Sequence, residues 1–279
     1  MPLRYAYNTN GAANHRLADA VALIAESGYD GVALTLDHHH LDPMAEGWVG
    51  RTEALARDLR ARNLGCVIDT GARFLLDPRR KHEPTLLSPT SEGRARRVAF
   101  LHRAIDIGNL LGAEAVSFWA GVPLPGVDRG EAGGWLVEGV AAVLDHAVRR
   151  GVAAALEPEP GMLVETLDDW ALLHHQLPSL KLALDLGHCL VTQERAPPAA
   201  VREFAPHIGT LAIEDMRRGE HIHLPFGEGD MDIPACLDAL RAVRFAGLVC
   251  VELSRESHRA DRMVPHSIEW LRRCREGVP

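Results

Sequence analysis

The chain lacks any apolar run long enough to cross a membrane, and its first residues form no apolar signal region. We therefore expect no membrane partner and no export by a recognisable signal. The five cysteines form no C-x-x-C pair, and their spacing is scattered. Because disulfide frameworks use paired cysteines, this pattern favours a reducing compartment, and we predict a cytoplasmic protein.

Positive charge is also scarce, since the formal net charge is −8 and no long basic cluster occurs. Proteins that bind nucleic acid usually carry a basic face, so we expect no nucleic-acid partner. A glycine-rich phosphate turn is missing as well, because the first expected strand runs into the tetrapeptide N-T-N-G at residues 8–11. This absence argues against an open, doubly wound sheet that binds a dinucleotide.

The chain does contain a regular alternation of strand-like and helix-like segments along its 279 residues. The expected strands span residues 4–8, 31–35, 65–69, 115–118, 152–157, 182–185, 208–213 and 247–252. The expected helices span residues 16–27, 51–62, 93–111, 135–150, 166–176, 197–204, 233–243 and 266–275. Alternating units of this kind form a parallel sheet, and eight of them close into a barrel of about 250 residues. We therefore predict one α/β domain over residues 1–279, a (β/α)8 TIM barrel.

Three of the expected strands end in an acidic residue, namely Glu157, Asp185 and Glu252. The carboxyl ends of the strands in a barrel meet at one mouth, where barrel enzymes carry their catalytic residues. Carboxylates placed together repel one another unless a cation neutralises them. A divalent metal (Mn²⁺, Co²⁺, Mg²⁺ or Zn²⁺) is therefore the cofactor that this pattern predicts. The alternative is that each acid caps a helix or pairs with a nearby arginine.

Histidines follow these strands closely. His188 lies three residues after Asp185, where it is a metal ligand, a substrate contact or a solvent-facing residue. His221 and His223 alternate in H-I-H, so both side chains point to one side of an extended segment. Both are candidate metal ligands, and simple loop polarity is the other interpretation.

Other polar or aromatic residues near the strand ends are weaker candidates. Trp119 ends the fourth expected strand, where it forms either an apolar wall for a substrate or part of the core. Residues 73–82 include several basic side chains that suit a substrate phosphate or carboxylate, although a solvated surface loop is the simpler interpretation. The histidines at 38–40 are consecutive, so they cannot all face one ion, and we do not expect them to be ligands.

Four short motifs occur in a fixed order: L-E-P-E-P-G at 156–161, L-D-L-G-H at 184–188, F-G-E-G-D-M-D at 226–232 and G-L-V-C-V-E at 247–252. With these motifs the chain resembles the xylose isomerase-like TIM barrel superfamily over nearly its whole length. This superfamily includes sugar and sugar-phosphate isomerases and epimerases, and nucleases of the endonuclease IV (AP endonuclease family 2) type. The chain also looks like an unassigned subgroup with N-T-N-G near the start and V-E-L-S-R at 251–255.

The resemblance implies a ligand set for the metal. Ketose 3-epimerases of the superfamily hold one metal with Glu, Asp, His and Glu. By position the first, second and fourth ligands fall on Glu157, Asp185 and Glu252. The third should be a histidine on the seventh strand, where this chain has Ala212. Either a histidine of the H-I-H segment replaces it, or the metal is weakly held, or the chain carries an inactivating change, natural or engineered.

The resemblance also implies a reaction, the isomerisation or epimerisation of a sugar or sugar phosphate through an enediolate. The metal would act as a Lewis acid on the substrate oxygens, while Glu157 and Glu252 remove and return the proton. His188 and Arg218 would hydrogen-bond substrate oxygens, and Trp119 would lie under the sugar ring. A small sugar-like molecule is thus the expected partner, and a homo-oligomer is compatible with the sequence.

Two other functions stay open at this point. One is a hydrolase or lyase of the endonuclease IV-like branch, whose D-x-H pattern falls on His221 and His223. That branch needs further histidines on the second and third strands, and the third expected strand, G-C-V-I-D, has none. The other is a non-catalytic barrel that binds a metabolite and has an incomplete metal site, because a fold alone does not determine function.

Overall fold

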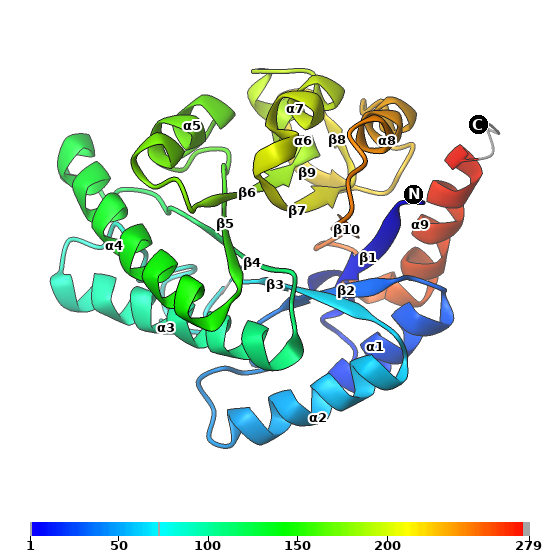
Figure 1. Ribbon diagram of the computed structural model, residues 1–279, viewed down its shortest axis with the longest axis horizontal. Helices are drawn as coiled ribbons and strands as arrows, with labels where there is room; N and C mark the ends of the chain where they lie inside the picture. The colour runs from blue at the N-terminus through cyan, green and yellow to red at the C-terminus, as the bar shows by residue number, and fades with distance from the viewer. Residues whose placement is uncertain (1, 72, 276–279) are drawn as a thin grey trace.

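Eight parallel strands close into a barrel in the computed structural model, which describes residues 2–71 and 73–275. Their order around the barrel is β1-β10-β7-β6-β5-β4-β3-β2, so the first strand pairs with the last (Figure 1). The strands are β1 (Arg4–Asn8), β2 (Gly31–Thr35), β3 (Gly65–Asp69), β4 (Ala115–Trp119), β5 (Ala153–Glu157), β6 (Lys181–Asp185), β7 (Ile208–Ile213) and β10 (Leu248–Val251). This arrangement confirms the predicted (β/α)8 TIM barrel.

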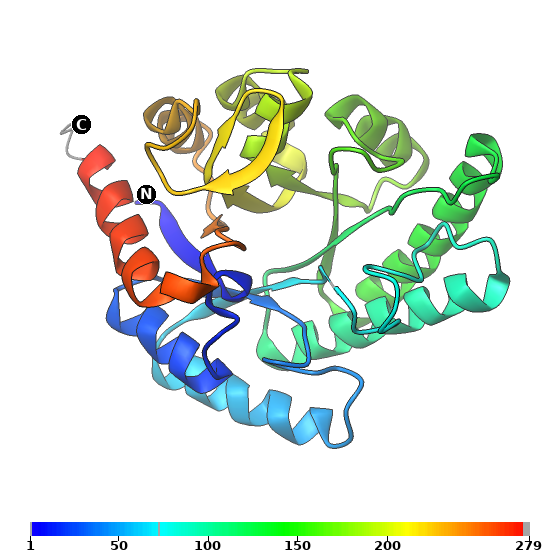
Figure 2. The same ribbon diagram turned by 180° about the vertical axis from the view of Figure 1, so that it is seen from behind.

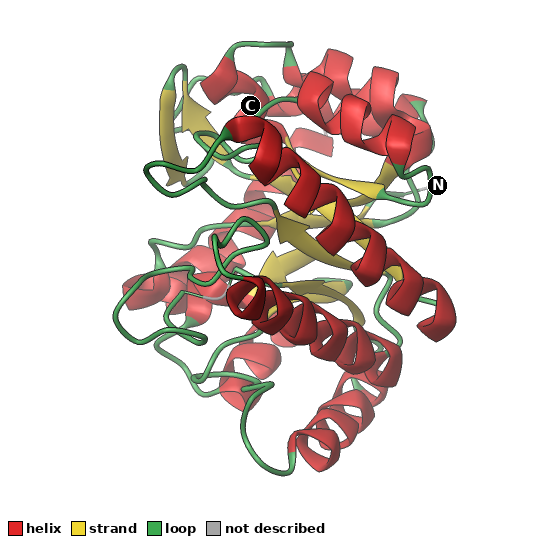
Figure 3. Cartoon of the chain, turned by 90° about the vertical axis from the view of Figure 1, so that its left-hand side faces the viewer, coloured by secondary structure: helices red, strands yellow, loops and turns green. Residues whose placement is uncertain are grey.

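Helices surround the barrel and cover the outward faces of its strands (Figures 1 and 3). They are α1 (Leu17–Glu26), α2 (Trp48–Ala61), α3 (Ser91–Leu111), α4 (Arg129–Arg150), α5 (Leu167–Gln176), α6 (Leu186–Thr192), α7 (Pro197–Phe204), α8 (Ile233–Ala242) and α9 (Ala260–Arg275). No helix in the described ranges is long and apolar enough to span a bilayer.

The strands are buried on both faces, which is why the sequence shows them as nearly continuous apolar runs. One large hydrophobic core joins the outer faces of the strands to the helices. A second, smaller cluster fills the inside of the barrel with mostly small side chains: Ala6, Ala33, Val67, Leu248 and Cys250. Because these side chains are short, space is left above them at the carboxyl ends of the strands.

Two helices begin well before the predicted residue, and one helix is not predicted at all. α4 begins at Arg129 and not at residue 135, because Asp128 caps it by accepting a hydrogen bond from the Glu131 amide (3.0 Å). α9 begins at Ala260 rather than at residue 266. The sequence predicts no helix at residues 186–192, where α6 follows β6 directly because Asp185 caps it.

The largest difference from the prediction lies after β7, where the sequence indicates a polar loop. This segment instead forms a small antiparallel hairpin of β8 (Asp215–Arg217) and β9 (Glu220–Leu224). Gly219 lies in the turn with a φ of +75°, a left-handed conformation that glycine adopts without steric cost. Figure 2 shows the hairpin, in yellow, on the viewer's side of the barrel.

One buried carboxylate, that of Asp215, holds the hairpin and the following loop together. Its Oδ1 accepts hydrogen bonds from the Met216 and Met231 amides, both at 3.0 Å. Its Oδ2 accepts another from the Gly227 amide at 2.8 Å. Hydrogen bonds to a charged acceptor are roughly twice as strong as neutral ones. The position of the two histidines on β9 therefore depends on Asp215.

We predict that Asp215→Asn destabilises the protein, because the amide nitrogen of asparagine would face backbone N–H groups instead of accepting from them. A buried polar group left without its partner costs about 1–3 kcal/mol, so the free energy of unfolding should fall by roughly that amount. Urea unfolding followed by circular dichroism measures the change.

Asp232→Asn is the matched control, since Asp232 is exposed and caps α8 through a hydrogen bond from the Ala235 amide (3.0 Å). Asparagine caps helices as well as aspartate does, so this variant should alter the free energy of unfolding by less than about 0.5 kcal/mol. An Asp215→Asn protein as stable as the control would show that Asp215 does not hold the hairpin.

Candidate active site

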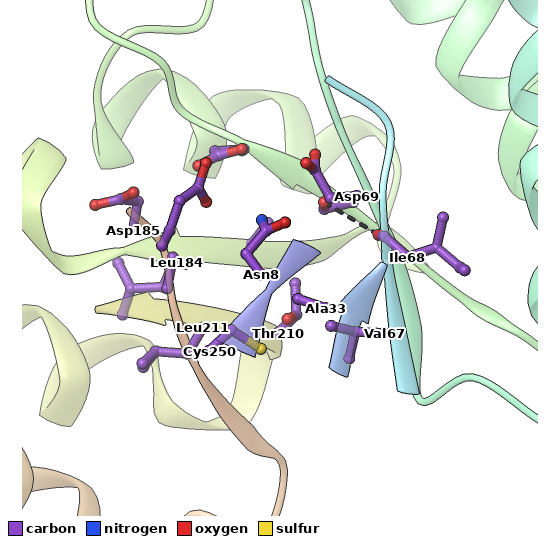
Figure 4. Close-up of a pocket in the computed structure, with 15 residues that line it drawn as sticks. Asn8, Ala33, Val67, Ile68, Asp69, Leu184, Asp185, Thr210, Leu211 and Cys250 are labelled. Atoms are coloured by element: carbon purple, nitrogen blue, oxygen red, sulfur yellow. Dashed lines mark hydrogen bonds between the residues drawn. The ribbon is translucent and has the colours of Figure 1, made fainter. Parts of the chain in front are cut away.

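A cavity of about 530 Å³ opens at the carboxyl ends of the barrel strands. Residues from the strand ends and from the loops after them form its wall, among them Asn10, Trp119, Glu157, His188, His221, His223 and Glu252. A narrow space of about 30 Å³ lies inside the barrel below it. Figure 4 shows this inner space, where Asp69 and Asp185 lie on opposite sides and Asn8 lies between them.

All three strand-end acids line the inner space. Glu157 ends β5, Asp185 ends β6, and Glu252 follows β10 directly. They lie near one another because β5 and β6 are neighbours and only β7 separates β6 from β10. The barrel thus gathers at one place three acids that are far apart in the sequence.

The three strand-end acids do not themselves form a single close group of metal ligands. Among the described residues, three sets of side chains bring one ligand atom each to within 4.8 Å of the others. These sets are Glu157, Asp185 and His188; Asp185, Glu214 and His223; and His188, His221 and His223. Glu252 belongs to none of them, and its Oε1 accepts a hydrogen bond from Asn10 Nδ2 at 2.9 Å.

Burial raises the pKa of two of these acids. The pKa of Glu157 lies well above its ordinary value, because burial disfavours the charged form and the neighbouring carboxylates repel it. Burial also raises the pKa of Glu252 to about 7, against the opposing effect of His223. A carboxyl group that ionises near neutral pH is suited to accepting and returning a proton.

Asp185, which is only 3% exposed, behaves differently. Its Oδ1 accepts a hydrogen bond from the His188 amide at 3.0 Å, and its Oδ2 lies 3.6 Å from His188 Nε2. Burial raises its pKa, but His188, His223 and the amide hydrogen bond outweigh burial, and the pKa falls below its ordinary value. Asp185 is therefore an acid of this site that keeps its negative charge.

The ring of His188 is buried, and both of its nitrogens have partners. Nδ1 lies 3.0 Å from the Pro158 carbonyl oxygen and donates a hydrogen bond to it. Nε2 lies 3.1 Å from His221 Nε2. One of these two Nε2 atoms donates and the other accepts, according to the tautomers of the rings.

The two histidines of β9 have different surroundings. His221 is partly exposed, and burial together with its histidine neighbours lowers its pKa to about 4. His223 is more enclosed. Burial lowers its pKa, but the neighbouring carboxylates, Glu214 first among them, outweigh burial and raise the pKa to about 10. His223 Nδ1 lies 3.8 Å from Glu214 Oε2. That either histidine binds a metal stays a prediction.

Glu214 is a residue of this site that the sequence patterns do not single out. It follows β7 directly, is 0% exposed, and has no hydrogen-bond partner for either carboxylate oxygen. Burial and the charge of Asp185 raise its pKa well above the ordinary value. The sequence does contain one signal for Glu214, its position two residues after Ala212. Side chains two residues apart point the same way along an extended chain.

Asp69 and Asn10 also line the cavity without being singled out by the sequence patterns. Asp69 ends β3, and its Oδ2 accepts a hydrogen bond from Thr35 Oγ1 at 2.6 Å. Because Asp69 is another strand-end acid, the reasoning that finds Glu157 applies to it equally.

The remaining candidates divide into two groups. Trp119 lies in the cavity wall, whereas Arg218 does not line it. Arg218 is exposed in the hairpin turn, where its amide donates to Asp230 Oδ2 at 3.0 Å. The basic side chains in the cavity wall are instead those of Arg73, Lys81 and Arg255. The first two come from the basic loop that the sequence indicates.

The donor atoms at the barrel mouth fit a divalent cation. Asp185 Oδ2, both carboxylate oxygens of Glu214 and Nδ1 of His223 are buried and have no hydrogen-bond partner. Buried polar atoms without partners are rare in folded proteins. Carboxylate and imidazole ligands together suit Mn²⁺, Co²⁺ and Zn²⁺.

A family model described as "Xylose isomerase-like TIM barrel" matches residues 21–274 of the chain. No curated protein matches the chain. Among solved structures, D-allulose 3-epimerase from Methylomonas sp. is 18% identical, with 98% of each chain covered and a TM-score of 0.77. The IolI protein with a binding zinc atom is 16% identical, with 99% of each chain covered and a TM-score of 0.77.

A third similar structure is the probable 3-DHS dehydratase AsbF from Bacillus anthracis. It is 15% identical, with 97% of this chain and 99% of that chain covered and a TM-score of 0.77. At such low identities these structures show a shared fold, on which at least two kinds of reaction occur.

We predict that Glu157→Gln stabilises the protein when divalent ions are removed with a chelator. Since the folded-state pKa of Glu157 is raised, folding opposes its ionisation, and stability is lost as the pH rises above the ordinary value of 4.5. The gain in free energy of unfolding over the wild type should therefore grow from pH 5 to pH 8, reaching about 1–3 kcal/mol. Urea unfolding at several pH values measures it.

Glu53→Gln, on the exposed face of α2, is the control for this substitution. Its free energy of unfolding should follow that of the wild type at every pH, because an exposed carboxylate remains hydrated in the folded state. A Glu157→Gln variant that is no more stable than this control at pH 8 would contradict the raised pKa.

Proposed function

The chain belongs to the xylose isomerase-like TIM barrel family, and we propose that it is a metal-dependent isomerase or epimerase of sugars or sugar phosphates. The observation that carries the proposal is a pair of buried carboxyl groups with raised pKa, Glu157 and Glu252, at one cavity. Proton transfer beside a carbonyl needs an acid and a base of this kind. The similarity to D-allulose 3-epimerase supports a sugar as the substrate.

Asp185 would hold the divalent cation, and Glu157 and Glu252 are the other ligands that the family pattern suggests. A histidine of β9 would replace the one that the pattern has at position 212. A cation bound there supplies Lewis-acid polarisation of a substrate carbonyl group. Its binding is favoured by the negative charge of Asp185 and by the unpartnered atoms beside it.

Glu157 and Glu252 carry out the proposed proton transfer. Their strands, β5 and β10, are separated in the barrel by β6 and β7, so the two carboxyl groups approach a substrate from different directions. One removes the proton beside the carbonyl, and the other returns it. Asn10 orients the Glu252 carboxyl group through its 2.9 Å hydrogen bond to Oε1. General acid–base catalysis of this kind contributes about 10²–10⁴ in rate.

The rest of the cavity wall suits a hydroxylated substrate with an anionic end. Trp119 offers an apolar ring face, and His188 Nε2 would exchange its contact with His221 for a substrate oxygen. Arg73, Lys81 and Arg255 place positive charge in the wall of the same cavity. A phosphate or carboxylate that binds to these cations would leave the carbonyl end of the substrate to the acids.

We predict that the protein, loaded with Mn²⁺ or Co²⁺ and incubated in D₂O, incorporates deuterium at the carbon beside the carbonyl of a ketose or ketose phosphate. Glu157→Gln and Glu252→Gln should each slow this exchange by about 10²–10⁴, because each variant lacks one of the groups that move the proton. Proton NMR of a panel of substrates measures the exchange.

Glu114→Gln serves as the control, since Glu114 pairs with Arg4 at the opposite end of the barrel (2.8 Å) and should leave exchange unchanged. Absence of exchange with every ketose in the panel, by protein shown to contain metal, would count against the proposed reaction.

We also predict that Arg73→Ala and Lys81→Ala raise KM for phosphorylated or acidic sugars by about tenfold, which corresponds to about 1.4 kcal/mol of binding. The KM for neutral sugars should not change, because only an anionic group meets these side chains. Arg57→Ala, on the exposed face of α2, is the control. Equal effects on neutral and anionic substrates would argue against an anion subsite.

A hydrolase or lyase reaction is the second candidate function, and the set of His188, His221 and His223 favours it. Three histidines are a ligand set typical of catalytic zinc. Metal analysis of the purified protein separates the two candidates. More than one equivalent of zinc would favour hydrolysis or elimination, whereas a single Mn²⁺ or Co²⁺ would favour the isomerase.

A further inference from the structure

We infer that Glu214, together with Asp185 and His223, binds the divalent cation, so that a carboxylate replaces the histidine of the family pattern at position 212. This ion site does not depend on the identity of the substrate, and it would exist in a protein with no sugar chemistry. Glu214 appears in no part of the family ligand pattern that the sequence matches.

The position of Glu214 on the strand supports this assignment. Ala212 lines the space inside the barrel, and its methyl group cannot bind an ion. Glu214 is two residues further along, so its side chain leaves the strand on the same side. The carboxylate of Glu214 also reaches Asp185 and His223, with ligand atoms of all three within 4.8 Å of one another. Metal–ligand bonds of about 2.0–2.2 Å place ligand atoms up to about 4.4 Å apart, so small side-chain movements suffice.

Four atoms of this set lack hydrogen-bond partners. Asp185 Oδ2, Glu214 Oε1, Glu214 Oε2 and His223 Nδ1 are all buried, and none has a hydrogen bond. Glu214 is 0% exposed, and within the described part of the chain its one ion-pair contact is His223 at 3.8 Å. Leaving a buried carboxylate without partners costs several kcal/mol, so such an arrangement indicates a missing ligand.

The charges of the set match a divalent ion. In the ion-bound form, two carboxylates and a neutral imidazole carry a total charge of −2, which one divalent cation balances. Protons that these groups hold without an ion are released when the ion binds. Of the nearby cationic side chains, Arg73, Lys81 and Arg255 line the outer cavity rather than the inner space beside Asp185. An ion at this point would satisfy every unpartnered atom of the set at once.

Space for the Glu214 carboxylate is provided by Gly187, the second residue of α6. A Cβ atom at position 187 would collide with Glu214 Oε1 and with the Met216 side chain. The absence of a side chain here therefore allows Glu214 to lie beside Asp185. Gly187 has no left-handed φ that would by itself require glycine, so the close approach of Glu214 and Met216 is what excludes a side chain here.

The competing set is that of His188, His221 and His223, which also closes to within 4.8 Å. Two of its three rings, those of His188 and His221, already have partners without an ion. His188 Nδ1 donates to the Pro158 carbonyl at 3.0 Å, and His188 Nε2 is paired with His221 Nε2 at 3.1 Å. Binding an ion there would break the contact between the two histidines, whereas binding at Glu214 breaks no hydrogen bond.

The test compares two variants that remove one candidate ligand each, Glu214→Gln and His221→Gln. Chelator-treated protein is titrated with Mn²⁺ alone, and the free ion is counted by electron paramagnetic resonance. We expect the wild type to bind one ion. We expect Glu214→Gln to lose at least tenfold in affinity, since even the loss of a supporting residue costs about 10–100-fold at metal sites. His221→Gln should stay within about threefold of the wild type.

Folding is monitored on the same samples by thermal melting without metal. Glu214→Gln should melt at or above the wild-type temperature, because it removes a buried carboxylate, while Mn²⁺ should raise the melting temperature of the wild type and of His221→Gln only. The double variant Ala212→His/Glu214→Gln should regain at least half of the lost affinity on a logarithmic scale. That recovery would show that positions 212 and 214 provide the same ligand.

Other results would overturn the assignment. These are wild-type protein that binds no Mn²⁺, Glu214→Gln that binds it as tightly as the wild type, or His221→Gln that weakens binding as much as Glu214→Gln. If Glu214→Gln fails to fold, anomalous diffraction from Mn²⁺-soaked wild-type crystals decides, since the ion must then lie in contact with the Glu214 carboxylate. The deuterium-exchange test of the proposed reaction can fail while these metal-binding results hold, so the two proposals are separable.

Discussion

The burial of several carboxyl groups at one end of the barrel is the constraint on which the rest of this site depends. Asp69, Glu157, Asp185 and Glu252 line the space inside the barrel. Glu214 lies close to Asp185 and to His223, one of the three histidines of the outer cavity. Each buried charge loses its hydration, at a cost of several kcal/mol. The parallel ladder of the barrel keeps these strand ends from moving apart. The chain therefore folds into an arrangement that binds protons or a cation at this end.

The hairpin β8–β9 places the imidazole groups of His221 and His223 near these acids. Its sequence is mostly polar, and Met216 is its one fully buried apolar side chain. In addition to this packing, the buried carboxylate of Asp215 accepts three backbone hydrogen bonds from the hairpin and the loop after it. A charged acceptor that satisfies several backbone donors fixes a loop more firmly than isolated neutral hydrogen bonds do. The positions of the β9 histidines in the cavity thus depend on the hydrogen bonds that Asp215 accepts outside it.

Much of this architecture can be predicted from the sequence, because strand length, apolar continuity and register are local properties. These properties place Glu157, Asp185 and Glu252 at one mouth. The hairpin cannot be predicted in the same way, because its pairing depends on Asp215 and on the left-handed turn at Gly219 rather than on an alternating apolar pattern. The burial of Glu214 also escapes sequence reasoning, since an acid just after a strand normally faces water.

If Glu214 holds the ion as we propose, the barrel has moved a ligand from position 212 to position 214 without changing its fold. Two residues along a strand amount to about 6.6 Å towards the mouth, and the side chain keeps its direction. The glutamate side chain is long enough to extend from position 214 back towards Asp185, which covers part of this distance. The hairpin lies at the outer level, which is why His223 can meet Glu214 there. With the ion closer to Glu214, Glu157 and Glu252 would be less needed as ligands. The groups that hold the ion would then differ from the groups that move a proton. A barrel allows this division because each strand contributes its side chain independently.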